Sequence, residues 1–114
     1  MITGIRPLHH PPPESITVTG ILHALSDPVR MRIVAELRKT DAGLNCVETT
    51  GRLNCAMAKS TCSQHYRILR ESGLIRSERH GVELTSRLRR AELDARFPGL
   101  LDAILKAGRK ENQG

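Results

Sequence analysis

The feature that most constrains the fold of this chain is a short polar helix, predicted to begin at a Ser60 N-cap and to end at Gly73. A serine hydroxyl in that position can accept a hydrogen bond from an unpaired N–H of the first turn. Cys62, Tyr66 and Leu69 recur at helical spacing and predict one buried face. Glycine is a common stop signal because it readily adopts the left-handed conformation that ends many helices.

The opposite face of this predicted helix carries only polar side chains. Hydroxyl, amide and cationic groups suit a DNA major groove, because they reach base edges and phosphates. A solvated surface helix of the same composition is the alternative at this point. The side chains of this face are Lys59, Ser60, Thr61, Ser63, Gln64 and Arg67.

The length of the chain indicates one domain, and its charge indicates the kind of molecule that it binds. The 114 residues fit one domain, and 18 basic against 12 acidic side chains give a net charge of +6. That excess favours a polyanion, most simply nucleic acid. One tyrosine, one phenylalanine and no tryptophan argue against binding to single strands or RNA by base stacking. The core must be aliphatic, and burial across a dimer interface would help so small a domain.

Cysteine usage and hydropathy predict a cytoplasmic protein. There are three cysteines, an odd number, and residues 1–14 lack the apolar region of a secretory signal. No run approaches the roughly 18 apolar residues that a membrane span needs, so no membrane partner is expected.

The chain divides into three parts in this interpretation. A proline-rich segment over residues 1–15 is expected to be a mobile arm. Residues 16–107 form the folded domain, and residues 108–114 form a polar, frayed tail. Asp27 and Pro28 predict a helix start, and Pro98 predicts another.

Periodicity predicts a mainly α fold with one small β-hairpin. Four helices precede two strands around Gly81, and a helical pattern resumes afterwards. This order is the winged helix-turn-helix arrangement. In that arrangement the polar helix described above enters the major groove, and the hairpin lies along the DNA backbone. The elements are expected at residues 17–25, 28–39, 47–53, 60–72, 74–80, 82–89 and from 91 onward.

Several stretches in the expected order resemble the ArsR/SmtB-type bacterial regulators. Residues 22–34, LHALSDPVRMRIV, resemble the opening of that family, and residues 59–75 resemble its recognition helix. Arg79-His80-Gly81 stands where the family carries its wing tip, and residues 91–105 resemble its last helix. The match covers roughly residues 20–106.

The resemblance implies a homodimer, formed through the first and last helices, on a palindromic double-stranded operator. It also implies a repressor that an effector releases from DNA. Gln64 is the best candidate for reading a base, since its amide can bond adenine bidentately. His65 matches a family histidine and is expected to pack or cap rather than read bases. The DNA contacts expected by this comparison are Lys59, Ser60, Thr61, Ser63, Gln64, Arg67, Arg79 and His80.

The effector stays open at this stage. Where metal-sensing relatives carry Cys-Val-Cys, this chain has Cys46-Val47-Glu48, and its last helix lacks histidine. No metal site or cofactor is therefore predicted, although a metal or metalloid effector is one alternative. Redox sensing by Cys46, Cys55 and Cys62 is another, with a disulfide between Cys46 and Cys55 if their helix ends meet. Purely structural cysteines are the third.

Two other classes of function compete with DNA binding. The sequence contains no phosphate-binding glycine loop, no His-Glu-x-x-His and no nucleophile elbow, so an enzyme is not expected. A winged-helix module that binds only proteins is the remaining alternative. Substitution of Gln64 and Arg67 would discriminate, because such a module should tolerate both changes.

Overall fold

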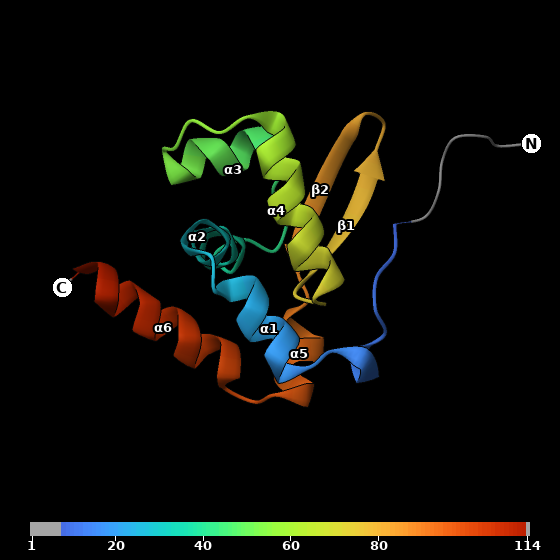
Figure 1. Cartoon of the computed structure of the whole chain (residues 1–114). Coiled ribbons are helices and arrows are strands. Elements are labelled where there is room, and N and C mark those ends of the chain that lie inside the picture. The colour runs from blue at the N-terminus through green and yellow to red at the C-terminus, as the bar shows by residue number, and fades with distance from the viewer. Residues whose placement is uncertain (1–7, 114) are drawn as a thin grey trace, which may run out of the picture.

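Helices surround a single hairpin in the computed structural model, which describes residues 8–113. Figure 1 shows α2 near the middle, with α3 and the hairpin tip at one end of the molecule and α1, α5 and α6 towards the other. The elements are a 3-10 turn at Pro13–Ser15, α1 Val18–Leu25, α2 Pro28–Leu37, α3 Cys46–Leu53, α4 Lys59–Glu71, β1 Ile75–His80, β2 Glu83–Leu88, α5 Arg90–Arg96 and α6 Leu100–Gln113. None of the helices in this range is long and apolar enough to cross a membrane.

Side-chain caps fix where the first three helices begin. The Asp27 carboxylate accepts hydrogen bonds from the backbone N–H groups of Val29 and Arg30, and Pro28 opens α2 as predicted. Asn45 and Glu48 form a reciprocal capping box at the start of α3. These bonds satisfy N–H groups that have no partner within the helix.

The core is aliphatic, as the composition predicted, and α2 lies at its centre. Ile33, Val34 and Leu37 on α2 are fully buried, as are Leu74 and Ile75 at the entry to the hairpin. Burial of each such side chain stabilises the fold by roughly 1.5–3 kcal/mol. The predicted change from helical to alternating periodicity near Leu74 is confirmed, because β1 begins at the next residue.

The hairpin is antiparallel and turns at Gly81, in a left-handed conformation with φ of 65°. The pair Ser77 and Ser86 lies mid-hairpin, and their buried hydroxyls are hydrogen-bonded at 2.7 Å. Leu44 exchanges two backbone hydrogen bonds of 2.9 Å with Ser86 and so pairs with the outer side of β2.

The prediction that Ser60 is the N-cap of the polar helix, α4, is wrong by two residues. Helix α4 begins at Lys59, and Ala58 is its N-cap without a side-chain hydrogen bond. The N–H of Cys62 bonds the Ala58 carbonyl at 3.0 Å, so Ser60 already lies within the first turn. Its hydroxyl is therefore free to face outward. The C-terminal stop is confirmed, since the helix ends at Glu71 and Gly73 has a φ of 87°.

The C-terminal segment is more ordered than the sequence predicted. Helix α6 continues to Gln113, so residues 108–113 are helical rather than a frayed tail. A Cβ at Gly108 would lie 2.5 Å from the Met31 sulfur on α2. The missing side chain lets α6 approach α2 closely.

Contacts of the N-terminal arm with the body were not predicted. Residues 1–7 of that arm lie outside the described residues. In the described part, His10 Nε2 accepts a hydrogen bond of 2.9 Å from the Ser77 N–H on β1. Arg89 donates to the Pro11 carbonyl at 2.8 Å and pairs with Glu92 at 2.7 Å. Arg89 is buried because these two partners enclose its side chain.

Candidate nucleic-acid interface

The inner face of α4 is locked into the core. Cys62 and Leu69 are fully buried and Tyr66 is 3% exposed, as the spacing predicted. The Tyr66 hydroxyl forms a buried hydrogen bond with the Thr49 hydroxyl on α3. Burial raises the pKa of Tyr66 well above its ordinary value, so the phenol stays neutral. This packing fixes the rotation of α4 about its axis and thereby decides which side chains point outward.

The outer face of α4 presents a continuous row of polar groups to solvent. Every residue that the sequence assigned to this face is exposed. Spacings of three and four residues place these groups on one side of successive turns. The exposed residues are Lys59, Ser60, Thr61, Ser63, Gln64 and Arg67.

Arg67 is held at the surface by a weak ion pair. Its Nε lies 3.2 Å from the Glu71 carboxylate, one turn further along α4, and both side chains are more than half exposed. An exposed pair of this kind contributes at most about 1 kcal/mol. Arg67 can therefore exchange Glu71 for a phosphate at small cost.

The hairpin carries the second group of predicted contacts. Arg79 and His80 are exposed beside the turn, and His80 Nε2 lies 3.7 Å from the Glu78 carboxylate. Glu78 also pairs with Arg87 on β2. Figure 1 shows the hairpin tip and the beginning of α4 at the same end of the molecule. Both groups of predicted side chains can thus meet one surface.

A buried arginine that the site prediction missed supports α4 from behind. Arg30 is 9% exposed, and its Nε donates to the Ala24 carbonyl at the end of α1 over 2.7 Å. A second nitrogen of the same guanidinium lies 3.5 Å from His65 Nδ1 on α4. His65 is half-buried, so the expectation of a packed histidine is confirmed. The sequence signal that could have identified Arg30 as a supporting residue was its place in the motif over residues 22–34, three residues after Asp27.

The structure does not bring together Cys46 and Cys55, the pair considered for a disulfide. Cys46 and Cys55 bracket α3 from its two ends, which the helical rise places roughly 13 Å apart, too far for a disulfide. Cys46 instead neighbours Cys62 on α4. Burial, together with a hydrogen bond from the Cys62 thiol to Cys46, raises the pKa of the Cys62 thiol to about 12. All three are free thiols. Within residues 8–113, no three His, Cys, Asp or Glu side chains gather as a metal site would require.

Comparison with known proteins identifies the family. A family model described as a helix-turn-helix domain matches residues 25–78. The HTH-type transcriptional repressor SmtB of Mycobacterium tuberculosis is 37% identical over 100 residues, which cover 86% of this chain and 68% of that protein. This chain belongs to the ArsR/SmtB family. The resemblance seen in the sequence motifs is thereby confirmed.

Solved structures of ArsR/SmtB-type proteins share this architecture. The transcriptional repressor BigR from Xylella fastidiosa superimposes with a TM-score of 0.61 at 27% identity, over 79% of this chain and 84% of that one. An ArsR-like transcriptional regulator from Rhodococcus sp. RHA1 gives a TM-score of 0.57 at 24% identity, over 83% and 86% of the two chains, and shows the fold alone. These similar proteins are transcriptional regulators rather than enzymes, and the winged helix-turn-helix fold is confirmed.

Proposed function

We propose that this ArsR/SmtB family member is a homodimeric transcriptional repressor that binds a palindromic double-stranded operator. The observation that carries the proposal is the outer face of α4, where six polar side chains are exposed while the opposite face is fixed in the core. A rigid helix with such a face fits the major groove, whose width accepts an α-helix.

The side chains divide into two roles in this proposal. Gln64 reads a base edge, because its amide can donate and accept at once. Lys59 and Arg67 neutralise phosphates, and the hydroxyls of the first turn, near the positive end of the helix dipole, bond phosphate oxygens. Arg79 and His80 add contacts from the hairpin to the backbone or the minor groove.

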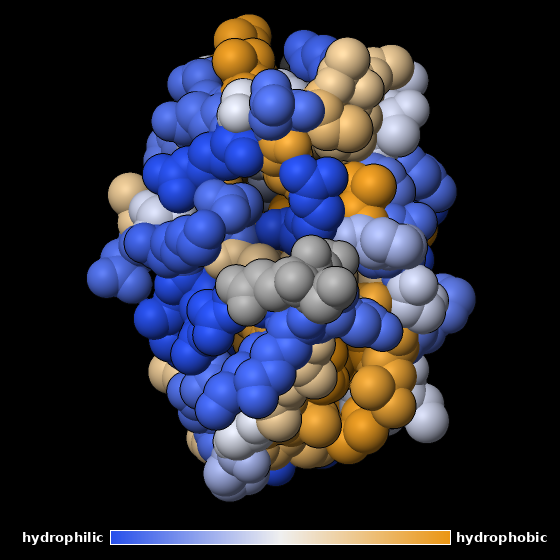
Figure 2. All heavy atoms as spheres, turned by 90° about the vertical axis from the view of Figure 1, so that its left-hand side faces the viewer, coloured by the Kyte–Doolittle hydropathy of each residue, from blue (hydrophilic) through white to orange (hydrophobic). Residues whose placement is uncertain are grey.

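Exposed apolar side chains support dimerisation through α1 and α6. Val18 and Leu22 on α1 are 40% and 48% exposed and lie one helical turn apart, so they form a small apolar patch. Figure 2 shows hydrophobic side chains gathered in the lower right of the face it presents, at the height of α1 and α6 in Figure 1. A two-fold dimer would bury this patch. It would also direct the two α4 helices to major grooves one turn, about 34 Å, apart.

The comparisons supply the direction of regulation. SmtB of Mycobacterium tuberculosis and BigR are both named repressors. A protein that represses genes in a bacterium works in the cytoplasm, where its operator lies. Release from DNA by an effector is part of the proposal because the family resemblance implies it.

Binding of labelled duplex DNA from upstream of the gene, followed by fluorescence anisotropy across a salt series, tests the proposal. We expect Arg67→Ala to weaken binding to all sequences and to reduce the salt slope by about one. Gln64→Ala should relax discrimination at one base pair by roughly 1–3 kcal/mol. Lys110→Ala is the matched control, because it removes an equal charge from an exposed position on α6.

The outcomes separate the two classes of function. A flat salt dependence, or affinity unchanged by both α4 substitutions, would assign the protein to the alternative class of winged-helix interaction modules. Repeating the titration with a thiol oxidant, arsenite or zinc tests whether the cysteines take part in release.

A further inference from the structure

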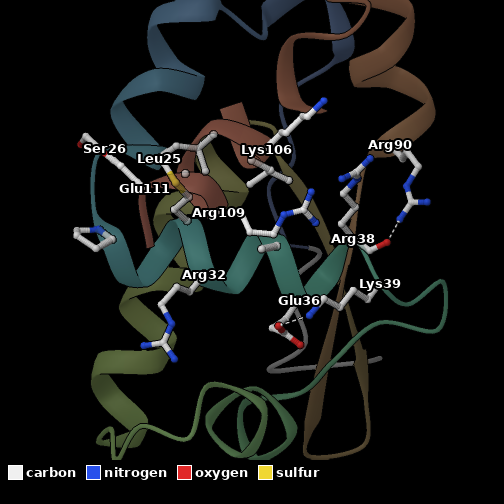
Figure 3. A pocket seen from close by; sticks show the side chains of 15 residues that line it. Leu25, Ser26, Arg32, Glu36, Arg38, Lys39, Arg90, Lys106, Arg109 and Glu111 are labelled. Atoms are coloured by element: carbon white, nitrogen blue, oxygen red, sulfur yellow. Dashed lines mark hydrogen bonds and ion pairs between the residues drawn. The ribbon is translucent and has the colours of Figure 1, made fainter. Parts of the chain in front are cut away.

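A cavity of about 730 Å³ lies between α2 and α6, away from the outer face of α4 (Figure 3). Its volume falls within the range of roughly 300–1,000 Å³ that is typical of small-molecule sites. The end of α1 and the first residue of α5, Arg90, complete its wall.

The floor of this cavity is apolar. Leu25 and Leu105 are buried there, and Met31 and Ala35 are half-buried. Gly108 adds no side chain, which keeps the backbones of α2 and α6 close at one end of the cavity. Binding of a hydrocarbon or aromatic group to this surface is therefore favourable, because its apolar area is removed from water.

The rim is strongly cationic. Six lysine and arginine side chains line the cavity against two carboxylates. Two of the six are neutralised, since Arg38 pairs with Asp102 at 2.8 Å and Lys39 pairs with Glu36 at 2.8 Å. Within the described residues, Arg90 donates a side-chain hydrogen bond to the Arg38 backbone carbonyl and forms no ion pair.

The other four cations on the rim form no ion pair among residues 8–113, and Glu111 is the one further carboxylate that lines the cavity. Lys106 and Arg109 on α6 make no ion pair with any residue in the range 8–113. Figure 3 shows Arg38, which directly follows α2, and Arg90 of α5 at one side of the cavity, with the Arg109 side chain of α6 extending in their direction. Arginine groups that converge in this way can bind one anionic head bidentately.

We propose that this cavity binds an amphipathic organic anion, with its apolar body on the floor and its anionic head between Arg90, Lys106 and Arg109. The site deepens the proposed function, on which its regulatory consequence rests. Helix α2 forms the cavity wall and also carries Arg30, which contacts His65 on α4. A ligand that changes the spacing of α2 and α6 would therefore act on the helix that supports the DNA-binding face.

The test measures binding to the full chain without DNA, so that its result is independent of repressor activity. The probe is 8-anilinonaphthalene-1-sulfonate, whose fluorescence rises in an apolar site, and decanoate below its micelle concentration is the competitor. We expect saturable binding, displacement by decanoate and at least about tenfold weaker displacement by uncharged decanol. The double variant Lys106→Ala with Arg109→Ala should bind the probe about tenfold more weakly.

Lys110→Ala is the matched control, because it removes a charge from the same helix outside the cavity. Circular dichroism checks that each variant keeps the wild-type fold. Absence of probe binding, equal displacement by decanol, or equal weakening by the control would overturn the proposal. Absence of binding by a protein that is dimeric in solution would mean that a second copy fills the groove. If the ligand-free protein binds the probe but no duplex DNA, the repressor is refuted and the cavity site stands.

Discussion

Replacing Gly73 by alanine should be among the most damaging single-methyl changes in this chain. Gly73 joins α4 to β1 at a φ of 87°, where a residue with a Cβ is strained by about 1–2 kcal/mol. The added Cβ would also lie 2.4 Å from Cγ1 and 2.7 Å from Cδ1 of Ile16, which is 1% exposed and has little room to move. Overpacking of this kind costs about 1–3 kcal/mol. We expect the free energy of unfolding to fall by about 2–5 kcal/mol.

Two other glycines separate these contributions. Gly81 also has a positive φ, of 65°, but nothing lies within 4 Å of its added Cβ. Gly81→Ala should therefore show the backbone strain alone, about 1–2 kcal/mol. Gly51 lies in α3 with open space around it, so Gly51→Ala should instead stabilise the protein by about 0.5–1 kcal/mol.

Urea unfolding followed by circular dichroism measures all three variants. Protein concentration must be held constant, because the stability of a dimer depends on it. The difference between Gly73→Ala and Gly81→Ala gives the cost of the clash with Ile16. If the two variants lose the same stability, the Ile16 side chain moves aside freely and the argument for tight packing at this junction is refuted.

Two further predictions concern pH and thiol chemistry. Burial, reinforced by nearby arginines, lowers the pKa of His10. Neutral His10 accepts the hydrogen bond from the Ser77 N–H, so this bond stabilises the fold fully above the unfolded pKa of about 6.5. The stabilisation is lost as the pH falls through the lowered pKa of the folded protein. His10→Ala should reduce the loss of urea resistance between neutral pH and about pH 5, and an unchanged loss would contradict this role. Iodoacetamide should modify Cys46 and Cys55 in the native protein but Cys62 only after unfolding, since that thiol is buried with a pKa of about 12. Native labelling of all three, read by mass spectrometry, would show that α4 opens readily.

The sequence predicted the elements well where local signals agree. The Asp27-Pro28 start, the apolar spacing of α4 and the Gly73 stop all act within a few residues, and the structure confirms each of them. The exposed face of α4 followed from the same periodicity. Its contacts with DNA remain predictions, because they depend on a molecule outside the chain.

The failures share one cause, which is dependence on residues distant in the sequence. The N-terminal arm was expected to be mobile, yet the Pro11 carbonyl accepts a hydrogen bond from Arg89, which also pairs with Glu92. Residues 108–113 have the composition of a tail but are helical, and Gly108 packs against Met31 of α2, which is distant in the sequence. The neighbouring thiols of Cys46 and Cys62 meet only through the packing of α3 on α4, which no spacing rule encodes.

The described part of the arm also changes how the hairpin meets other chains. A two-stranded sheet has two open edges, each a row of N–H and carbonyl groups on which a foreign strand can add. Leu44 occupies one edge through its two bonds to Ser86, and His10 satisfies the Ser77 N–H on the other. The chain thus closes both edges near their middle with its own segments. The arm thereby acts against aggregation as well as for stability, and a shortened protein that lacks it would offer β1 to the β1 strand of its neighbour.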